Sequence, residues 1–487
     1  MSYFRPSGTA REQAIGGTMG SLGGDITANF VNPAGLGFYK TGEALFSPGY
    51  GFNTSKTNYL SNKTNSPSVN NFIIGTSGFV YGWSSPEPGS STAISLAVTR
   101  SADFNAHVSY QGSNPISSGA EAYAEEFNNS GLTLDQAIAE PGISYGTRMA
   151  LWTYLVDTAN GGSSTVVQPL NVLATDGQLG QQMDIRTSGG ITEIALGLAG
   201  VTKDKWYIGA SIGVPIVSYQ QTLQYTETDL SGNTNNDFAS YTYSEYYTSS
   251  GVGVNGRVGV IFRPNLNWRI GLAVHTPSFY SLTDKVSSSM VTNTEGYAGI
   301  RTVQSSELPQ GDLGNSLTYD LQTPWHLLVS GSYIFPGAVT HGSMGFVTAD
   351  IEYIAVKSTR FSLPTDANGN TVNSGYYDPL NNTIKDYYKN TFNFRMGGEY
   401  KMNDKLAIRL GGSYTMNPYS SPELKANRTT LSGGVGYRIK GVFVDLTYIE
   451  AISNDVNIPY RLALKDNVFS TVKQYTGNIL LTLGIKF

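Results

Sequence analysis

Charged residues stand at the centres of several segments whose side chains otherwise alternate between apolar and polar or small. The charges are of both signs, and the set comprises Arg257, Arg395, Glu399, Arg409 and Asp445. In a β-strand, alternate side chains point to opposite faces, so the apolar residues share one face and the charges share the other. The charges could form ion pairs among themselves or with an enclosed segment. The arginines could instead guide a carboxylate, which arginine binds well through two parallel hydrogen bonds.

Residues that usually carry catalysis or bind metals show no such grouping. The four histidines, His107, His275, His326 and His341, are scattered without metal-ligand spacing, and there is no cysteine. Residues 251–256 fit a dinucleotide-binding glycine pattern, but they lie inside an alternating strand with no helix after it. No nucleophile and base form a recognisable arrangement. We therefore expect a protein that is not an enzyme and that holds no metal and no cofactor.

The composition narrows the class of protein further. Charged residues make up 14% of the chain, against about 25% in typical soluble domains. The net charge is −5 and no cluster of Lys and Arg is present, which argues against nucleic-acid binding. No apolar run approaches the roughly 20 residues of a membrane-spanning helix. The first six residues also lack the apolar core of a signal peptide.

Alternating segments recur along the chain and are clearest at its C-terminus. There Ile479, Leu481, Leu483 and Ile485 alternate with residues that are mostly polar or small. Many of the apolar faces end in an aromatic residue, as at Trp206, Trp268, Trp325, Tyr414, Tyr437, Tyr448 and Phe487. Aromatic girdles at both ends of an apolar band are typical of transmembrane β-barrels. Such a sheet must close, because unpaired backbone groups at a sheet edge cannot be satisfied in lipid.

Short and long connections alternate between these segments. This asymmetry is typical of outer-membrane barrels, whose long loops are extracellular. We therefore predict an all-β transmembrane antiparallel β-barrel of about 14 strands over residues 43–487, placed in the outer membrane of a Gram-negative cell in contact with its lipid and lipopolysaccharide. Pro48, Pro215 and the sequence His275-Thr276-Pro277 mark candidate kinks, bulges or strand ends, since proline removes a ladder donor.

Residues 1–42 fit neither a helix nor a strand. Glycines interrupt any helix, and the apolar residues do not alternate as they would in a strand. We predict that this segment is a plug, or hatch, inside the barrel lumen. Four of its apolar side chains could line a hydrophobic substrate path or simply anchor the plug to the wall: Met19, Leu22, Ile26 and Phe30. Asn32, Pro33, Ala34 and Gly35 are expected to form a fixed turn.

Residues 103–187 form the largest connection, and we predict a partly helical extracellular insertion. Residues 118–128 should form a helix, and Thr133 with Gln136 resembles a capping box. The apolar residues that follow could form a ligand groove, a helix packed over the barrel mouth or a protein-docking surface: Met149, Leu151, Trp152, Leu155 and Val156. Exposed apolar patches usually indicate a binding role.

The stretch Gly8–Tyr39 resembles the hatch of the outer-membrane long-chain fatty-acid transporter (FadL/TodX-type) family, and most closely its members from Bacteroidetes-type bacteria. The resemblance is carried by GTAR, by the glycines of AIGGTMGSLGGD and by NPAGLGFY. It implies a plugged barrel for passive uptake of hydrophobic small molecules such as long-chain fatty acids. It also implies that ligands enter from outside and leave through a gap in the wall made by a strand kink.

A second function is compatible with the sequence. In that family the ligand-gating helices lie in middle loops, whereas the most helical insertion here is the second outer loop by our strand count. The chain could therefore be a barrel that does not transport and that serves as a structural or docking subunit for other outer-membrane proteins or lipoproteins.

Overall fold

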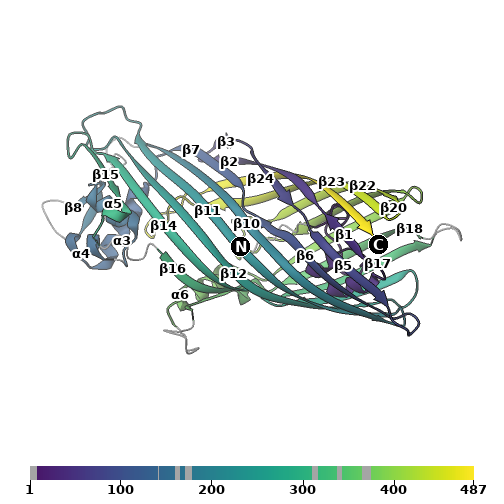
Figure 1. Cartoon of the computed structure of the whole chain (residues 1–487). Helices are drawn as coiled ribbons and strands as arrows, with labels where there is room; N and C mark the ends of the chain where they lie inside the picture. The colour runs from purple at the N-terminus through teal and green to yellow at the C-terminus, as the bar shows by residue number, and fades with distance from the viewer. Residues whose placement is uncertain are drawn as a thin grey trace.

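A closed antiparallel β-barrel makes up most of the chain. The structure is a computed structural model that describes residues 8–140, 142–158, 165–170, 178–309, 316–336, 343–364 and 375–487. One sheet of 22 strand segments forms 14 spans, because several spans are interrupted. The predicted fold class is confirmed. Figure 1 shows the barrel, with its C-terminus at the end of the short turns.

The 14 spans follow one another around the barrel in chain order. They are β1 and β2 (Glu43–Phe46, Pro48–Tyr59), β4 and β5 (Val69–Ile74, Ser77–Ser84), β6 and β7 (Ser91–Asp103, Ala106–Asn114), β10 (Leu179–Thr202), β11 (Trp206–Asp229), β12 (Ser240–Phe262), β13 and β14 (Trp268–His275, Phe279–Asn293), β16 and β17 (Ser316–Gln322, His326–Pro336), β18 and β19 (Ser343–Ile354, Arg360–Ser362), β20 (Thr391–Lys401), β21 (Leu406–Thr415), β22 (Arg428–Ile439), β23 (Val442–Asn457) and β24 (Ser470–Lys486).

The barrel closes where its first span pairs with its last. Glu43 stands opposite Lys486, and Gly49 stands opposite Leu480. Two further strands, β3 (Asn62–Asn65) and β15 (Ile300–Gln304), add to the outer ends of β2 and β14. Closure pairs the edges of the sheet, as a sheet that crosses lipid requires.

An apolar band covers the outer surface of the barrel half that lies next to the short turns. Leu196, Ile208 and Leu410 belong to it and are 54%, 63% and 70% exposed. Trp206 and Trp268 border it beside the short turns. Such a band with interfacial aromatics is the lipid-facing surface of a transmembrane barrel. Among the residues that the structure describes, no helix has both the length and the apolar character needed to cross a membrane.

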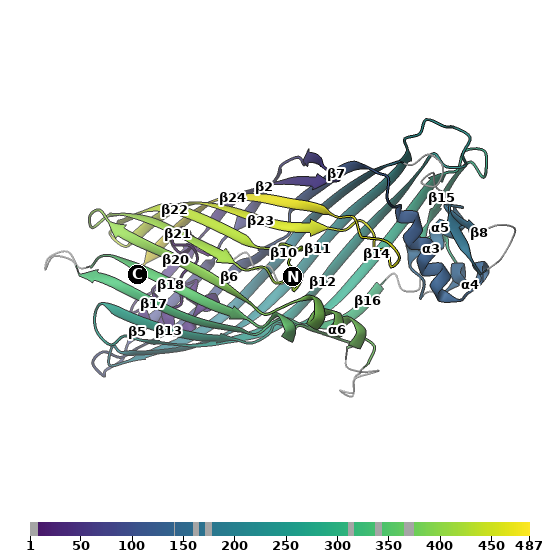
Figure 2. The same cartoon turned by 180° about the vertical axis from the view of Figure 1, so that it is seen from behind.

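Four consecutive spans extend far beyond this band (Figure 2). The strands β10 and β11 are each 24 residues long, whereas roughly 9–11 residues cross a bilayer. On β11 the outward side chains change from apolar, ending at Ile216, to polar at Gln220 and Thr222. The outer halves of these strands therefore form a sheet in water. In the sequence, the same segments are parts of the predicted loops, so the strands are longer than expected.

The helical insertion packs against the extended sheet. It contains α3 (Gly119–Ser130), α4 (Leu134–Ala139), α5 (Tyr145–Trp152) and the paired strands β8 (Val156–Thr158) and β9 (Val167–Pro169). The helix predicted at 118–128 is α3, and the capping box of Thr133 and Gln136 begins α4. Its core joins Phe127, Met149 and Leu155 to strand residues such as Met183 and Tyr241. The remaining outer elements are η2 (Ser305–Glu307), η3 (Val356–Ser358) and α6 (Asp378–Tyr387).

A buried carboxylate fixes the start of α3. Glu227 accepts hydrogen bonds from the Ser118 hydroxyl at 2.5 Å and from the Gly119 N–H at 2.7 Å. The Tyr225 hydroxyl donates to the same carboxylate at 2.6 Å. Close by, the Tyr460 hydroxyl donates to the Ser117 carbonyl at 3.0 Å. Burial raises the pKa of Tyr460 to about 12, so this hydroxyl stays protonated at neutral pH.

Three neighbouring spans are interrupted side by side. The breaks lie at residues 276–278, 323–325 and 355–359. Two of them contain a proline, as the sequence predicts for Pro277. Backbone bonds still close the wall, since the Thr323 N–H donates to the Ser278 carbonyl at 3.1 Å. Pro48 begins β2 after a break. At Pro215, β11 continues in unbroken pairing with β10, but its ladder with β12 omits residues 214 and 215, so the proline interrupts the pairing on one side only.

The N-terminal segment lies inside the lumen, as a plug. It contains α1 (Ala10–Ala14), α2 (Ala28–Val31) and the 3₁₀-helix η1 (Pro33–Phe38). The Thr9 hydroxyl caps α1 by accepting from the Glu12 N–H. Asn32 caps η1, because its Oδ1 accepts from the Ala34 N–H at 3.1 Å. This bond explains the fixed turn expected at residues 32–35.

We predict that Phe127→Ala loosens the insertion without opening the barrel. The Phe127 side chain is 0% exposed, and removing a buried phenyl ring costs about 3–5 kcal/mol. Limited proteolysis and hydrogen exchange should show faster cleavage and exchange in residues 119–152 with unchanged barrel strands. The matched control is Trp152→Ala, whose side chain is 48% exposed and whose loss should change little. Equal effects of the two variants would contradict this packing.

Candidate functional site

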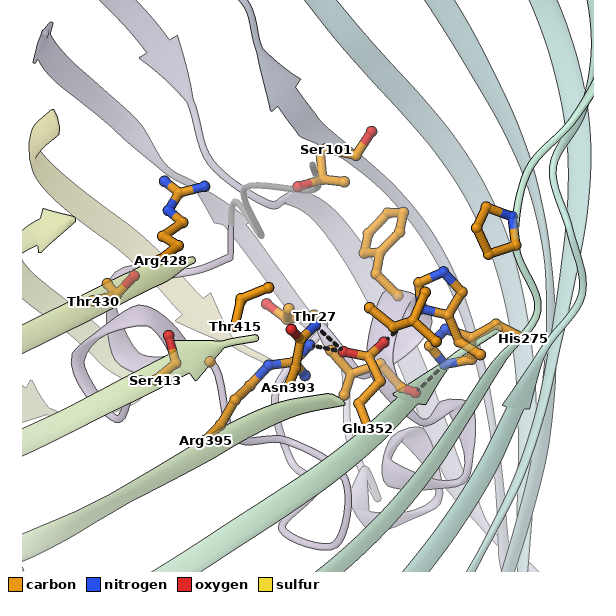
Figure 3. A pocket seen from close by; sticks show the side chains of 18 of the residues that line it. Thr27, Ser101, His275, Glu352, Asn393, Arg395, Ser413, Thr415, Arg428 and Thr430 are labelled. Atoms are coloured by element: carbon orange, nitrogen blue, oxygen red, sulfur yellow. Dashed lines mark hydrogen bonds and ion pairs between the residues drawn. The ribbon is translucent and has the colours of Figure 1, made fainter. Parts of the chain in front are cut away.

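A cavity of about 200 Å³ lies between the plug and the outer part of the barrel wall. From the plug, α1, Phe30 and Val31 line it. From the wall, its lining residues include Thr99, Ser101, Glu193, Arg257, His275, Thr323, His326, Glu352, Asn393, Arg395, Ser413, Thr430 and Asn478. In Figure 3, Thr27 comes from the plug, and the other labelled side chains come from strands on different sides of the lumen. The cavity is therefore the space that remains once the plug is in place.

An apolar patch lies on one side of the lumen, directly outward of this cavity. Tyr280 and Tyr319 belong to it, a few residues beyond the cavity-lining Ser278 and Thr323 on their spans. Phe104 also belongs to it, and its ring packs edge to face against the ring of Tyr219, with centroids 5.4 Å apart. The other members are Ala102, Ile191, Val217, Leu282, Leu321, Phe361, Leu363 and Tyr377. A molecule that reaches the cavity from outside would pass this apolar patch.

Wall side chains bind the irregular backbone of the plug. Asp350 Oδ2 accepts from the N–H groups of Met19 and Gly20, both at 3.2 Å. The Thr447 hydroxyl donates to the Ala10 carbonyl at 2.5 Å, and the Ala10 N–H donates to Thr482 Oγ1 at 2.8 Å. The bonds to the N–H groups of Ala10, Met19 and Gly20 satisfy backbone donors that have no helix or sheet partner, which burial would otherwise make costly.

Glycines in the wall let the plug backbone approach closely. A Cβ added at Gly271 would lie 2.0 Å from the Gly20 carbonyl oxygen. One added at Gly411 would lie 2.1 Å from the Gly16 nitrogen. Real Cβ atoms do not approach this closely, so any larger residue at either position would displace the plug. The high glycine content thus serves the contact between wall and plug as well as the plug itself.

The predicted lumen charges on the last spans form one buried cluster. Arg409 donates from Nε to Glu399 at 2.7 Å and from Nη1 to Asp445 at 2.5 Å. The plug residue Arg11 adds a second cation, with its Nε 3.7 Å from Glu399. The cluster therefore ties the plug to the wall electrostatically as well as through hydrogen bonds.

The two other predicted arginines face the cavity. Arg257 holds Glu193 with two hydrogen bonds, at 2.7 and 3.1 Å. Arg395 donates to Glu352 Oε2, which also accepts from Asn393 Nδ2 at 2.9 Å. Each guanidinium is thus paired with a carboxylate of the wall, so a ligand carboxylate would have to compete for it.

Two histidines complete this polar wall. The ring nitrogen Nε2 of His275 lies 2.7 Å from the Val31 carbonyl of the plug, and His326 Nδ1 lies 2.8 Å from Glu352 Oε1. The carboxylate and imidazole atoms of His275, His326 and Glu352 lie within 4.8 Å of one another. In the part of the chain that the structure describes, this is the group whose atoms are placed to hold a metal ion. His341 lies outside the described residues.

Along one seam of the described wall, no strand ladder joins the two sides. The ladder between β5 and β6 ends at Ser77 and Val98, and β4 pairs with β2. Among the described residues, no ladder joins β4 to β6 or β7. Side chains bridge the seam, with Asn71 Nδ2 2.7 Å from Asp103 Oδ2. We call the stretch of wall between residues 69–76 and 99–105 the side seam.

The apolar residues expected to bind ligand lie in three different places. In the insertion, all but one are buried in its own core: Met149, Leu151, Leu155 and Val156, with Trp152 half exposed. In the plug, Met19, Leu22 and Ile26 are buried against the wall. Phe30 alone among the nine lines the cavity. The structure therefore does not bring the two sets together.

Sequence reasoning missed the cavity-facing histidines and the side seam. His275 and His326 are 51 positions apart, and only the register that places them opposite each other brings them together. One signal in the sequence could have drawn attention to these histidines, because each lies two residues from a proline that interrupts its span. Residues 69–76 have the composition of an ordinary strand, so the sequence does not predict that no ladder joins them to the next span.

Comparison with known proteins identifies the fold. No protein-family model matches the sequence, and no curated protein matches it. Solved structures do match over essentially the whole of both chains. They include a FadL homologue of Pseudomonas aeruginosa (TM-score 0.58, 14% identity, 100% of each chain). They also include the toluene transporter TodX of P. putida (0.52, 13%, 99% of each chain) and the monoaromatic hydrocarbon channel CymD (0.50, 13%, 100% of this chain and 99% of that chain). The chain therefore shares the fold of these proteins.

We predict that Gly271→Ala displaces the plug. Forcing a methyl group into a filled space costs about 1–3 kcal/mol, which corresponds to a roughly ten- to hundredfold loss of protection in the hydrogen exchange of residues 16–24. The matched control is Gly331→Ala on the neighbouring strand, because nothing lies within 4 Å of a Cβ added there. Equal protection of the plug in both variants would contradict the close contact.

Proposed function

We propose that this protein lets hydrophobic small molecules cross the outer membrane passively, through the cavity and then sideways through the side seam. The observation that carries the proposal is that the cavity reaches the seam. Thr99 and Ser101, which form one edge of the seam, are also cavity-lining residues. A molecule in the cavity therefore lies beside a stretch of described wall where neighbouring spans are joined by side chains rather than by a ladder.

The path outward of the cavity supports the same direction of passage. The apolar patch that includes Tyr280 and Tyr319 offers a surface on which a hydrophobic molecule can leave water. Below the cavity the plug is held by the wall, as at Asp350 and Thr447. A molecule that leaves the cavity sideways, through the side seam, does not require those bonds to break. No energy source is needed, because apolar molecules partition from water into the membrane spontaneously.

The volume of the cavity limits the size of the ligands that fit in it. At about 200 Å³ it is smaller than the roughly 300–1,000 Å³ of pockets that enclose drug-sized ligands. A single aromatic ring needs less room than a long acyl chain. We therefore propose small hydrophobic molecules of this type as the first ligands to test, with long-chain fatty acids as the second class. A fatty acid would need the plug to shift or the seam to open before the whole chain entered.

The alternative function, a docking subunit of a larger outer-membrane complex, rests on the insertion. Most of the apolar residues that suggested a docking surface are buried in the insertion core, which weakens this alternative. Trp152 and Tyr154 remain exposed at its surface. Extraction in a mild detergent followed by native mass spectrometry separates the two functions. A stable complex with other proteins would favour docking, and a bare monomer that takes up ligand would favour passage.

We predict that closing the side seam stops passage. The chain has no cysteine, so Asn71→Cys with Asp103→Cys can be joined by the short thiol crosslinker dibromobimane without competing reactions. Cells that lack other hydrophobic-uptake barrels should take up labelled toluene and oleate through the uncrosslinked protein. Uptake should fall to the level of cells without the protein once the crosslink forms.

The matched control joins two strands that already pair. Thr283 and Thr318 stand opposite each other on β14 and β16, with their hydroxyls 3.0 Å apart. Crosslinking Thr283→Cys to Thr318→Cys should leave uptake unchanged. Undiminished uptake with the seam crosslinked would exclude the lateral route, and absence of uptake by the native protein would exclude passage altogether.

A further inference from the structure

Three ligand-type side chains meet on the inner wall where the neighbouring spans are interrupted. His275 is the last residue of β13 and His326 the first residue of β17, and the two stand opposite each other in register. Glu352 lies on β18, two residues before Ile354, the register partner of His326. Adjacent and diagonal positions on one face of a sheet lie close enough for side chains to share a ligand. All three line the cavity, and Figure 3 labels His275 and Glu352 there.

Hydrogen bonds to the far side of two of these groups orient them. Metal-bound histidines usually donate their other ring N–H to a carbonyl or carboxylate, and bound carboxylates are themselves hydrogen-bonded. His275 has such a bond, with Nε2 2.7 Å from the Val31 carbonyl, which leaves the lone pair on Nδ1. Glu352 has its Oε2 held by Asn393 and Arg395 while its Oε1 faces His326. This outer shell distinguishes the group from a chance cluster.

The charges around the group are close to balanced. Arg395 donates to Glu352 and also interacts electrostatically with Asp350 and Glu12. Arg257, which pairs with Glu193, interacts with His275. The case for an ion therefore rests on the two imidazoles and the carboxylate that meet here, not on a surplus of negative charge.

We propose that His275, His326 and Glu352 bind one divalent transition-metal ion of the Zn²⁺ class. Two imidazoles and one carboxylate suit Zn²⁺, Co²⁺, Ni²⁺ or Cu²⁺, whereas Mg²⁺ and Ca²⁺ prefer oxygen ligands alone. Three protein ligands leave further coordination positions open, which water from the cavity fills. The ion takes the place of the proton between His326 Nδ1 and Glu352 Oε1, and that proton leaves to solvent.

A bound ion would add a side-chain link between the plug and the wall. Its ligands come from three consecutive spans at the level of their breaks, and His275 in turn contacts the plug through Val31. The ion would thereby connect the plug to three spans of the wall. The metal site does not depend on the proposed passage, because the ion can bind whether or not the protein transports hydrophobic molecules.

Cobalt titration of the purified protein tests the site directly. The protein should carry no histidine tag, because a tag would itself bind the ion. Titration with Co²⁺ should give visible d–d absorption that saturates at one ion per chain and that added Zn²⁺ abolishes. His275→Gln, which keeps a donor for Val31, and Glu352→Gln should each weaken binding at least tenfold. Asn393→Ala should weaken it about 10- to 100-fold, as loss of an outer-shell partner does.

The matched control is His107→Gln. His107 also pairs with a carboxylate, its Nε2 lying 2.6 Å from Asp184 Oδ2, but it does not line the cavity. Cobalt affinity should be unchanged in this variant, and circular dichroism should show a folded barrel in every variant used. Absence of cobalt absorption in the native protein, or equal affinity in the native protein, His275→Gln and Glu352→Gln, would overturn the proposal.

Discussion

The structure depends on one constraint: an irregular polypeptide is enclosed in a barrel, and each of its buried backbone groups needs a partner. A helix or a strand would satisfy these groups internally, but most of the plug is neither. The wall therefore supplies the partners from its inner face, through Asp350 to the N–H groups of Met19 and Gly20 and through Thr447 to the Ala10 carbonyl. It also supplies room, through glycines that let main chain touch main chain, as at Gly271. The polar lumen and the glycine content of the strands have this common cause.

The same constraint shapes the proposed route. Because the wall must be polar where it holds the plug, the floor of the cavity is polar, with Glu193, Arg257, Glu352 and Arg395 bound to one another in pairs. Paired charges are weaker attractants for a charged ligand than free ones. The apolar patch that includes Tyr280 and Tyr319 lies outward of this floor. A hydrophobic molecule on the proposed route would thus stay near this patch and the side seam and would avoid the charged floor.

Much of the fold could be predicted from the sequence, because alternation records which face of each strand meets lipid. The C-terminal strand at Ile479–Ile485 and the inward arginines, such as Arg409, follow from it directly. Two features could not be predicted. Beyond Ile216 the strand β11 continues in water, where the alternation no longer contrasts apolar with polar, so these residues resembled a loop. The cavity depends on register across spans: His275 and His326 meet only because β13 pairs with β17, and no local pattern specifies that pairing. The apolar residues Met149 and Leu155 suggested a ligand groove but lie in a buried core. Composition cannot separate the two, because a core and an apolar groove have the same residue types.

The length of β10 and β11 determines how much of the protein a detergent micelle can cover. At about 3.3 Å per residue, a strand of 24 residues is roughly 80 Å long, of which the hydrocarbon core takes less than half even when the strand is tilted. A detergent micelle would therefore cover only the half with the short turns. The other half, a rigid sheet carrying a helical cap, would stay free of detergent and be available for crystal contacts or antibody fragments. The same height would place the cap well above the lipid headgroups of a cell, where it would be the part of the molecule that large particles meet first.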